Sequence, residues 1–422
     1  MHGLADLARE LDLLRARAAA GTLKAKVSVE DLAGLVRLPR STLHSYLSGQ
    51  TLVPSEVLDR VVLALGADSA EQREWNEAWY RLHARAPGRP RAVPPGAPFC
   101  LPPVARGFTG RAAELAELDR LAGNGFDAGP VISAICGAPG VGKTTLALQW
   151  AHRVRDRFPD GCLYVDLRGY DPDPPLPVAD ALAALLGSLA PDEPIPSDHA
   201  VLAARFRSRL AGRRVLVLLD NALCAEQVRP LLPGTGSCLV VVTSRDDLAG
   251  LVARDGAHRV ELDVLPLPDA VSLLDSLLGG ERVAAAGLAR RCGRLPLAIR
   301  VAAERATSRP AASPAGEGWF LDWLADGGDA RTDLRAVFSW SYRHLLRHHR
   351  EAARVFRLLG AHPSTEFTVD TVAELSETEP DQIQHLIDRL LRAHLVEPSV
   401  SHRFRMHRLL HAYAGELERT TG

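Results

Sequence analysis

The chain has 422 residues, a length that accommodates two to four domains, each with a sizeable hydrophobic core. Hydrophobic residues make up 46% and charged residues 24%, the composition of an ordinary soluble globular protein. The formal net charge of −1 excludes a chain that coats nucleic acid along its whole length, but it leaves room for one small basic module.

Cysteine and lysine usage adds to this picture. The six cysteines are scattered without metal-ligand spacing, and three lie in apolar, strand-like runs where a free thiol packs as a small hydrophobe. No signal peptide opens the chain, and no apolar run reaches the ~18 residues of a membrane span. We therefore expect a cytoplasmic protein with no membrane partner. Only three of the 50 basic residues are lysines (Lys24, Lys26 and Lys143), which draws attention to each.

Residues 1–85 predict a domain of short helices that contains a helix–turn–helix. In the segment VSVEDLAGLVRLPRSTLHSYLSGQ (27–50), Leu32, Ala33 and Val36 form the buried stripe of the first helix. The Leu38–Pro39 pair ends that helix, and Ser41 is expected to cap the second. This segment resembles the repressor-type helix–turn–helix family.

In that family the second helix addresses the major groove of double-stranded DNA with its N-terminal end. The residues expected to contact DNA point outward from this helix or stand at its entrance: Arg37, Arg40, Ser41, Thr42, His44 and Ser45. Residues 15–50 carry six basic and two acidic side chains, a local charge of +4 that suits phosphates. A helical bundle that contacts protein rather than DNA is the alternative.

The sequence divides the rest of the chain into four parts. Residues 86–107 hold seven prolines and predict a semi-rigid linker. From 108 to 264, apolar runs alternate with helical patterns, which predicts an α/β domain with a parallel sheet covered on both faces. These runs are 131–136, 162–167, 215–220, 238–244 and 259–264. Residues 265–330 predict a helical subdomain. Residues 331–422 predict a winged-helix subdomain, with room for a hairpin in VEPSVSHRFRMH.

A phosphate-binding motif follows the first predicted strand. GAPGVGKTT (137–145) fits GxxxxGK[ST] and precedes a helical pattern, the context in which this motif forms a P-loop. The expected nucleotide contacts are Gly137, Ala138, Pro139, Gly140, Val141, Gly142, Lys143, Thr144 and Thr145. Backbone N–H groups and the helix N-terminus would hold the phosphates, Lys143 the β- and γ-phosphates, and Thr144 a Mg²⁺ ion.

Two later strands supply further catalytic candidates. VLVLLDNA (215–222) places Asp220 at the carboxyl end of a strand, where it would coordinate Mg²⁺. Many ATPases have an acid at the next position, but this chain has Asn221, so we expect slow hydrolysis at most. The strand VVVTSRD ends with Arg245, placed to sense a γ-phosphate; a surface ion pair is the alternative role. The run 162–167 lies between the two motifs in sequence, which indicates the ATPase branch with an added central strand.

With these motifs in order, residues 105–420 resemble the NB-ARC proteins of the STAND class of signalling NTPases. Six ordered elements carry the resemblance: FTGRAAELAEL, GAPGVGKTT, LLDN, TSRD, GRLPLAI and FRMHRLLHAYA. It implies that the segment with Phe108, Gly110 and Arg111 wraps the adenine and ribose. It also implies that Pro296 packs on the nucleotide and that His407 reaches the β-phosphate of ADP.

The sequence departs from this family at two places. Arg408 replaces the acid that usually follows the histidine, so the lock that this acid helps to form is either altered or supplied by other residues. The chain also ends just after the motif, where relatives usually continue into a sensor. Either the sensor is absent, or the chain is a piece of a longer protein with a further sensor partner or ligand. For the pair His407 and His411, a zinc site and a plain structural helix are the alternatives to nucleotide sensing by His407.

The resemblance implies a transcription regulator controlled by ATP and ADP. ADP would hold a closed monomer, and ATP would open it, promote self-association and bring several helix–turn–helix modules to DNA. A slow turnover ATPase is a second interpretation. A defence or scaffold protein that recruits protein through its N-terminal helices is a third.

Overall fold

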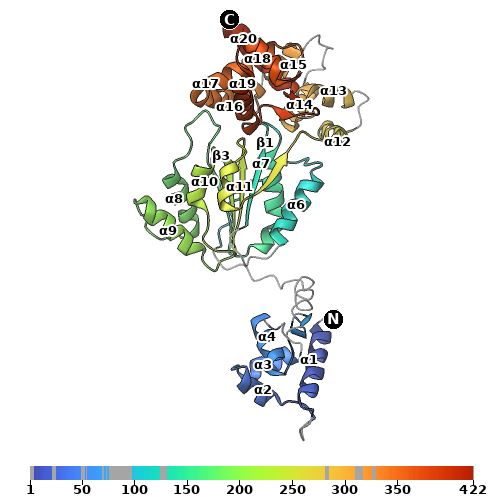
Figure 1. The fold of residues 1–422 in the computed structure, drawn as a ribbon, viewed down its shortest axis with the longest axis vertical. Helices are drawn as coiled ribbons and strands as arrows, with labels where there is room; N and C mark the ends of the chain where they lie inside the picture. The colour runs from blue at the N-terminus through green and yellow to red at the C-terminus, as the bar shows by residue number, and fades with distance from the viewer. Residues whose placement is uncertain are drawn as a thin grey trace. The chain divides into compact units, whose positions relative to one another are not determined.

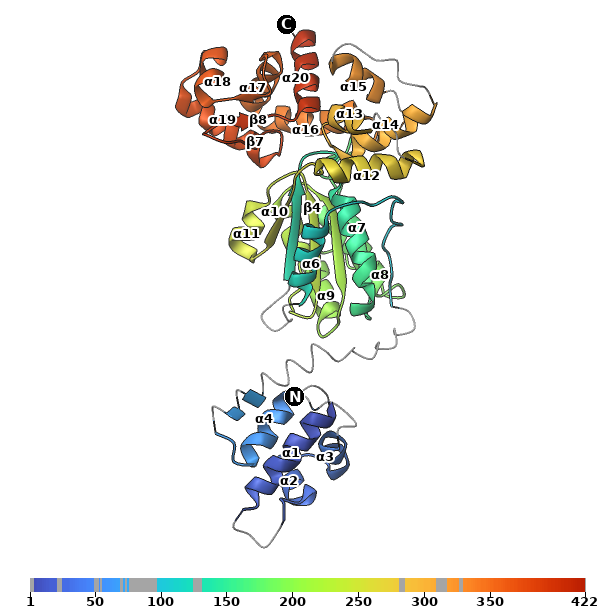
Figure 2. The ribbon, with the colours of Figure 1, turned by 90° about the vertical axis from the view of Figure 1, so that its right-hand side faces the viewer.

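The computed structural model describes most of the chain. The chain divides into two compact units, and the boundary between them in the sequence follows residue 91. The described residues are 4–20, 25–48, 53, 55–68, 71–72, 74–75, 97–123, 131–280, 285–308, 317–325 and 329–421. Figures 1 and 2 show the helices and strands of each unit. Among these residues, no helix combines the length and the apolar character needed to cross a membrane.

The first unit is a small helical domain, as the sequence predicts. Its helices are α1 (Leu4–Ala18), α2 (Val29–Leu35), α3 (Arg40–Leu47) and α4 (Ser55–Ala64). The predicted stripe of α2 is confirmed, because Leu32, Ala33 and Val36 are all buried in one core with Leu43 of α3. Ser28 caps α2 by accepting a hydrogen bond from the backbone N–H of Asp31.

The expected cap of the second helix is wrong, and the expected positive charge is reduced by ion pairs. Helix α3 begins at Arg40, two residues earlier than a cap at Ser41 implies, so Ser41 lies inside the helix and Pro39 occupies the cap position without a side-chain bond. The local charge of +4 is also neutralised in part, because Arg15 and Lys26 both pair with Asp12 and Arg17 pairs with Glu71. Both of these acids lie outside residues 15–50.

A five-stranded parallel sheet forms the centre of the second unit. All five predicted strands are confirmed, in the spatial order β2-β3-β4-β1-β5. Their bounds are β1 (Val131–Gly137), β2 (Cys162–Asp166), β3 (Leu216–Ala222), β4 (Leu239–Ser244) and β5 (His258–Leu262). Although β2 lies between β1 and β3 in sequence, it forms the sheet edge, and β4 separates β1 from β3.

Helices cover both faces of this sheet, as continuous apolar strands require (Figure 2). Alternate strand residues enter two separate cores: Ile135 belongs to the core that contains residues of α6 and α7, and Ile132 belongs to the core that contains residues of α8 and α9. The helices are α6 (Ala112–Gly123), α7 (Lys143–Val154), α8 (Val178–Leu189), α9 (His199–Leu210), α10 (Ala225–Val228) and α11 (Ala249–Asp255). Two single 3₁₀ turns, Arg155–Arg157 and Arg229–Leu231, follow α7 and α10.

The remaining elements form a helical part and a winged helix. The helical part contains α12 (Leu267–Leu278), α13 (Ala285–Arg291), α14 (Pro296–Ser308) and α15 (Glu317–Ala325). The winged helix contains α16 (Leu334–His348), α17 (Arg350–Ala361), β6 (Glu366–Phe367), α18 (Val369–Ser376), α19 (Pro380–Arg392), β7 (Glu397–Pro398), β8 (Phe404–Arg405) and α20 (Arg408–Thr421). The predicted hairpin is the antiparallel pair β7–β8, which β6 extends to three strands.

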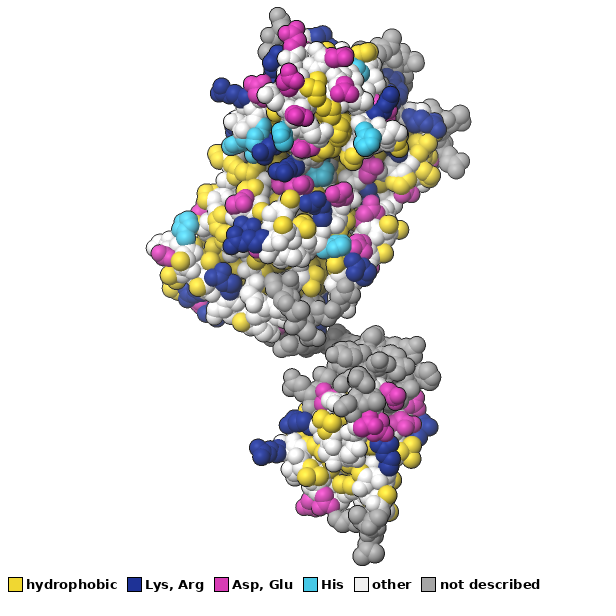
Figure 3. Space-filling model, viewed as in Figure 1, with side chains coloured by type: hydrophobic (Ala, Val, Ile, Leu, Met, Phe, Trp, Pro, Cys, Tyr) yellow, Lys and Arg dark blue, Asp and Glu magenta, His cyan; other side chains and the backbone are white. Residues whose placement is uncertain are grey.

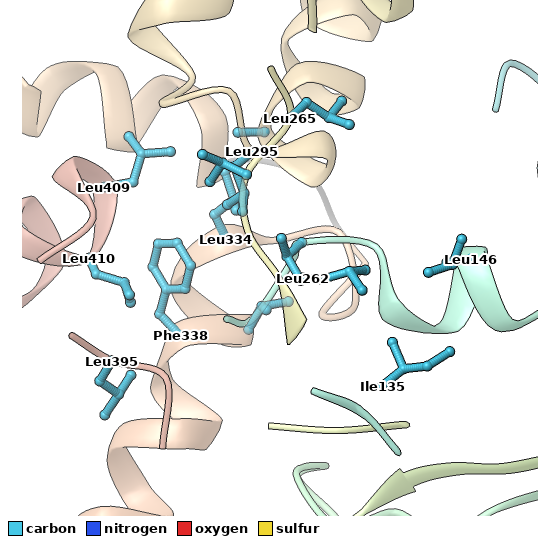
Figure 4. Close-up of a cluster of buried hydrophobic side chains, with 14 of the residues drawn as sticks. Ile135, Leu146, Leu262, Leu265, Leu295, Leu334, Phe338, Leu395, Leu409 and Leu410 are labelled. Carbon is cyan, nitrogen blue, oxygen red and sulfur yellow. The ribbon is translucent and has the colours of Figure 1, made fainter. Parts of the chain in front are cut away.

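One apolar core joins the sheet, the helical part and the winged helix. Figure 4 shows Ile135 of β1, Leu295 before α14, Phe338 of α16 and Leu410 of α20 within this single cluster. Burial of such side chains stabilises by roughly 1.5–3 kcal/mol each, so the three parts are held together chiefly by apolar contacts. The outer surface is different: on the face seen in Figure 3, basic and acidic side chains are interspersed.

Candidate nucleotide site

The loop between β1 and α7 has the geometry of a phosphate cradle. It runs from Gly137 to Gly142, and α7 begins at Lys143. Gly142 stands at the helix N-cap with φ 96°, a left-handed conformation that glycine adopts without strain. At Gly137 a side chain could not fit, because a Cβ atom would lie 2.5 Å from the carbonyl oxygen of Leu262. The first backbone N–H groups of α7 have no acceptor within the helix, so its N-terminus is suited to bind an anion.

Lys143 is a cation held inside this loop. Its Nζ donates to the carbonyl oxygens of Gly137, at 2.8 Å, and Ala138, at 2.9 Å. Burial, with a smaller contribution from the charge of Arg245, lowers the pKa of Lys143 to about 7. Carbonyl groups alone compensate a buried ammonium poorly, so an anion such as phosphate would stabilise its charged form. The residues present thus fit a phosphate group.

Asp220 lies at the carboxyl end of β3, surrounded by hydroxyl groups. Its Oδ1 accepts from Thr144 at 2.7 Å and also from Thr243, and its Oδ2 accepts from Tyr164 at 3.1 Å. Burial raises the pKa of Asp220, while the hydroxyl donors oppose this shift. The adjacent Thr144 hydroxyl and Asp220 carboxylate are hard oxygen ligands, so they fit Mg²⁺, which would neutralise phosphate charge when bound.

Asn221 follows at a bulge in β3. Its φ is 55°, a left-handed conformation that asparagine tolerates better than most residues. The backbone N–H of Asn221 donates to Thr243 Oγ1 at 2.9 Å, and its side-chain Nδ2 lies 3.4 Å from Asp171 Oδ1. The amide is therefore directed at a carboxylate on another loop.

Arg245, at the end of β4, lies in contact with helix α16 of the winged helix. Its Nη1 donates to the carbonyl oxygen of Val337 at 2.7 Å and to Ser341 Oγ at 2.9 Å. The guanidinium also lies over the rings of Tyr170, at 5.4 Å, and Trp340, at 5.6 Å. Arg245 is buried, and this burial lowers its pKa to about 10. The alternative of an exposed surface ion pair is therefore wrong.

These side chains surround a cleft of about 430 Å³. Eight predicted nucleotide-site residues line it: Gly140, Gly142, Lys143, Thr144, Thr145, Asp220, Arg245 and Pro296. The sequence prediction missed Asp166, Asp171 and Arg331, which line the same cleft. Asp166 ends β2, within the predicted strand 162–167, and could have been found by the argument used for Asp220, whereas nothing near Arg331 in sequence points to this place.

Comparison with known protein families agrees with this geometry. A model for a helix-turn-helix domain matches residues 6–75, and a model for the NB-ARC domain matches residues 116–282. The chain therefore contains an N-terminal helix–turn–helix domain and an NB-ARC domain.

Curated relatives carry the names of regulators. The chain is 41% identical over 336 residues to regulatory protein AfsR of Streptomyces coelicolor, a match covering 75% of the chain and 33% of the relative. The AfsR protein of Streptomyces griseus is 39% identical over 331 residues, with the same coverage. A putative HTH-type transcriptional regulator of Mycobacterium tuberculosis is 33% identical over 186 residues, or 41% of the chain and 20% of the relative. The chain thus spans about a third of the length of the AfsR proteins.

Among solved structures, a STAND protein with a tetratricopeptide repeat sensor from Pyrococcus horikoshii matches 75% of the chain and 44% of its own. The identity is 14% and the TM-score is 0.35.

Arg111, in the segment before α6, is hydrogen-bonded to the phosphate loop of this NB-ARC domain. Arg111 is buried with φ 64°, and its Nη2 donates to the carbonyl oxygens of Val141, at 3.1 Å, and Asp263, at 2.7 Å. Phe108 packs against the core, and a Cβ at Gly110 would lie 2.6 Å from Asp269 Oδ2. Of the described residues, those that line the cleft do not include these three, so their proposed contact with adenine and ribose stays a prediction.

The expected nucleotide contacts of the helical part and of the winged helix differ in their positions. Pro296 lines the cleft as expected. His407, in contrast, places Nε2 3.0 Å from the carbonyl oxygen of Gly293, and it is not among the described residues that line the cleft. His411 places Nε2 2.9 Å from the carbonyl oxygen of His362, so the two imidazoles serve different contacts. Arg408, the departure from the family pattern, donates to the carbonyl oxygen of Arg290 at 2.9 Å.

The candidate DNA-contacting residues lie on and before α3 of the first unit. Arg37, Arg40, Ser41 and His44 are exposed, and Thr42 and Ser45 are half-buried. Arg37 has φ 53° in the turn between α2 and α3. These six positions form an outward surface with two arginines, and their contact with DNA stays a prediction.

Proposed function

We propose that this chain is a transcription regulator controlled by ATP and ADP. The observation that carries the proposal is the position of Arg245. This cation lines the nucleotide cleft and at the same time bonds to Val337 and Ser341 of the winged helix. A group that competes for Arg245 inside the cleft therefore weakens the contact that holds the winged helix. The names of the AfsR proteins and of the mycobacterial regulator support a role in transcription.

The nucleotide would act through this competition. Lys143 would bind the β- and γ-phosphates, and Thr144 and Asp220 would hold Mg²⁺ beside them. ADP lacks the γ-phosphate and leaves Arg245 on α16, whereas the γ-phosphate of ATP draws Arg245 away. A second contact, from the backbone N–H of Asp247 to the carbonyl oxygen of Arg392 at 3.0 Å, would then open with the first. A full switch requires nucleotide and signal together to shift the equilibrium by about 5.5 kcal/mol.

DNA binding would require several copies of the chain. With Arg15, Arg17 and Lys26 paired to acids, Arg37 and Arg40 are the cations left on the proposed DNA surface of the described residues. Few phosphate contacts per module give a modest affinity. Self-association in the ATP state would bring several modules to one promoter, so that their effective concentration raises occupancy.

The test compares the full chain loaded with ADP and with a non-hydrolysable ATP analogue. Light scattering measures the mass, and a promoter fragment selected in vitro measures the affinity for DNA. We expect a larger mass and tighter DNA binding with the ATP analogue, and neither change in Lys143→Ala. Equal mass and equal affinity in both states would refute the switch.

The same DNA selection separates the proposal from a scaffold that recruits protein. A regulator enriches a defined sequence in at least one nucleotide state. If the full chain enriches no sequence in either nucleotide state, the helical domain binds protein instead.

A further inference from the structure

An acid that does not follow Asp220 in the sequence is present nearby in the structure. After Asp220 the chain has the neutral amide Asn221, which cannot accept a proton from water. The Nδ2 of Asn221 lies 3.4 Å from Oδ1 of Asp171, a residue 50 positions away. Asp171 also lines the cleft with Lys143 and Asp220. A carboxylate thus lies beside the side-chain amide of Asn221, although the sequence has no acid directly after Asp220.

The loop that carries Asp171 is held by hydrogen bonds to β3. The backbone N–H of Leu167 donates to the carbonyl oxygen of Asp220 at 2.8 Å, and that of Gly169 donates to Asn221 at 2.7 Å. Gly169 lies so close that an added Cβ would be 2.5 Å from the backbone nitrogen of Leu223. These contacts hold Asp171 on a rigid support, as a catalytic group requires.

Asp171 is also the carboxylate whose chemistry suits proton transfer. Its side chain is 8% exposed. Burial raises the pKa of Asp171, and the neighbouring carboxylate of Asp166 raises it further, so it is a stronger base than an exposed aspartate. Asp220, by comparison, already accepts bonds from Thr144, Thr243 and Tyr164.

Arg331 covers this carboxylate in the present arrangement. Its Nη2 lies 3.2 Å from Asp171 Oδ2 and 3.4 Å from Asp166 Oδ2. Arg331 precedes α16, and its side chain is two-thirds exposed at the cleft. An arginine in this position holds one carboxylate oxygen and lowers the basicity of Asp171. Movement of the winged helix would remove it.

We propose that Asp171 is the general base for hydrolysis of a nucleoside triphosphate in this cleft, with Asn221 as its positioning residue and Arg331 as its block in the closed arrangement. The inference rests on the proposed function, which places ATP in the cleft. Asp171 takes one proton from water as the water oxygen bonds to the γ-phosphorus. The bond from this phosphorus to the β–γ bridging oxygen breaks, and its electron pair stays on ADP. The products are ADP and inorganic phosphate, and Asp171 returns its proton to solvent.

A single-turnover assay with the full chain and Mg·ATP tests the assignment. We expect Asp171→Asn to lower the rate of phosphate release by about 100-fold or more, the usual contribution of a general base. ATP affinity, measured with a fluorescent analogue, stays within about threefold of the wild-type value, which shows that the fold and the cleft are intact. Asp173→Asn, the same change two residues along an exposed part of the loop, leaves the rate unchanged.

Exchange of Asp171 and Asn221, with the pH–rate profile as readout, tests whether the carboxylate acts as a base or only as a structural contact. In the double variant Asp171→Asn with Asn221→Asp, the amide and the carboxylate trade places and keep their mutual contact. The carboxylate then occupies the usual position after Asp220, and aspartate tolerates the left-handed backbone there. We expect the exchange to recover about tenfold or more of the lost rate, with a shifted acidic limb in the pH–rate profile.

The outcomes separate this inference from the proposed function. Failure of the wild-type chain to bind ATP or ADP refutes both. Binding without any phosphate release by the wild-type chain, or a wild-type rate in Asp171→Asn, overturns the assignment of the base alone. So does a rate recovered by the exchanged pair with an unshifted acidic limb, because restoration of the mutual contact alone would then explain the recovery. An equal loss in the single variant and the exchanged pair overturns it as well, because a carboxylate after Asp220 would then supply no base.

Discussion

The guanidinium of Arg245 donates to the hydroxyl oxygen of Ser341 across 2.9 Å, although 96 residues separate them in sequence. This bond joins the end of β4 to the middle of α16, and so joins the cleft to the winged helix. Arg245, a cation that lines the cleft, is therefore also part of the contact between two subdomains.

Removal of this hydroxyl should weaken the closed arrangement. Ser341→Ala takes away one hydrogen bond to a buried cation, worth about 1.5–3 kcal/mol. We expect ADP to dissociate about tenfold faster, as measured with a fluorescent ADP in stopped flow. Ser339→Ala is the matched control, because Ser339 donates to Ala336 within α16 itself. Equal dissociation rates in all three proteins would contradict the proposed coupling.

Lys143 should be required for stabilisation by nucleotide. At a ligand concentration of 100 times Kd, binding adds about 2.7 kcal/mol to the free energy of unfolding, which raises Tm by several degrees. We expect Mg·ATP to raise Tm of the wild-type chain and not that of Lys143→Ala. Lys26→Ala keeps the shift, since Lys26 is a half-exposed residue of the other unit paired with Asp12. Loss of the shift in both variants would point to a global effect of lysine removal.

The same residue predicts a pH dependence of stability without nucleotide. In the folded chain the pKa of Lys143 is about 7, against 10.5 for an exposed lysine. Between these values the unfolded chain binds more protons, so the contribution of Lys143 to the free energy of unfolding rises with pH from about 7 to 10.5. Urea denaturation at pH 7, 8 and 9 should show a steeper rise for the wild-type chain than for Lys143→Met. Parallel curves would contradict it.

Gly293 and His407 should couple the helical part to the winged helix. Gly293 has φ 60°, and an added Cβ would lie 2.2 Å from His407 Nε2. Gly293→Ala should therefore cost more than the roughly 1–3 kcal/mol of backbone strain alone. The control is Gly256→Ala, at φ 69° with open space around it.

Addition of His407→Ala to Gly293→Ala removes the clash. The double variant should then be more stable than the sum of the two single losses predicts, as measured by a double-mutant cycle in urea. Additive losses would show that the two residues do not act on each other.

Arg40 should contribute to DNA binding through phosphate. Arg40→Ala is expected to weaken binding to all DNA sequences and to reduce the slope of log K against log salt by about one. Arg17→Ala serves as control, because Arg17 pairs with Glu71. Fluorescence anisotropy across a salt series measures both. If Arg17→Ala lowers the slope and Arg40→Ala does not, α1 rather than α3 faces the DNA.

Several parts of this protein could be predicted because their signals are local. The five strands are continuous apolar runs, and the phosphate loop needs glycine at Gly142 for its left-handed backbone. The stripe of α2 follows from helical spacing. The start of α3 differs by two residues from the prediction because Pro39 takes the cap position without a side-chain bond, so the preference for a serine cap does not apply.

The sequence by itself determined the fold class, the phosphate loop and the helix–turn–helix, since short-range sterics and apolar periodicity act between near neighbours. Only the tertiary structure decided which distant groups meet. It placed Asp171 beside Asn221, Arg331 over Asp171, Arg245 on Ser341 and His407 on Gly293 rather than in the cleft lining. Such pairs depend on how the helices and strands pack against each other. The partner of a charged or amide side chain therefore cannot be predicted from the residues around it in the sequence.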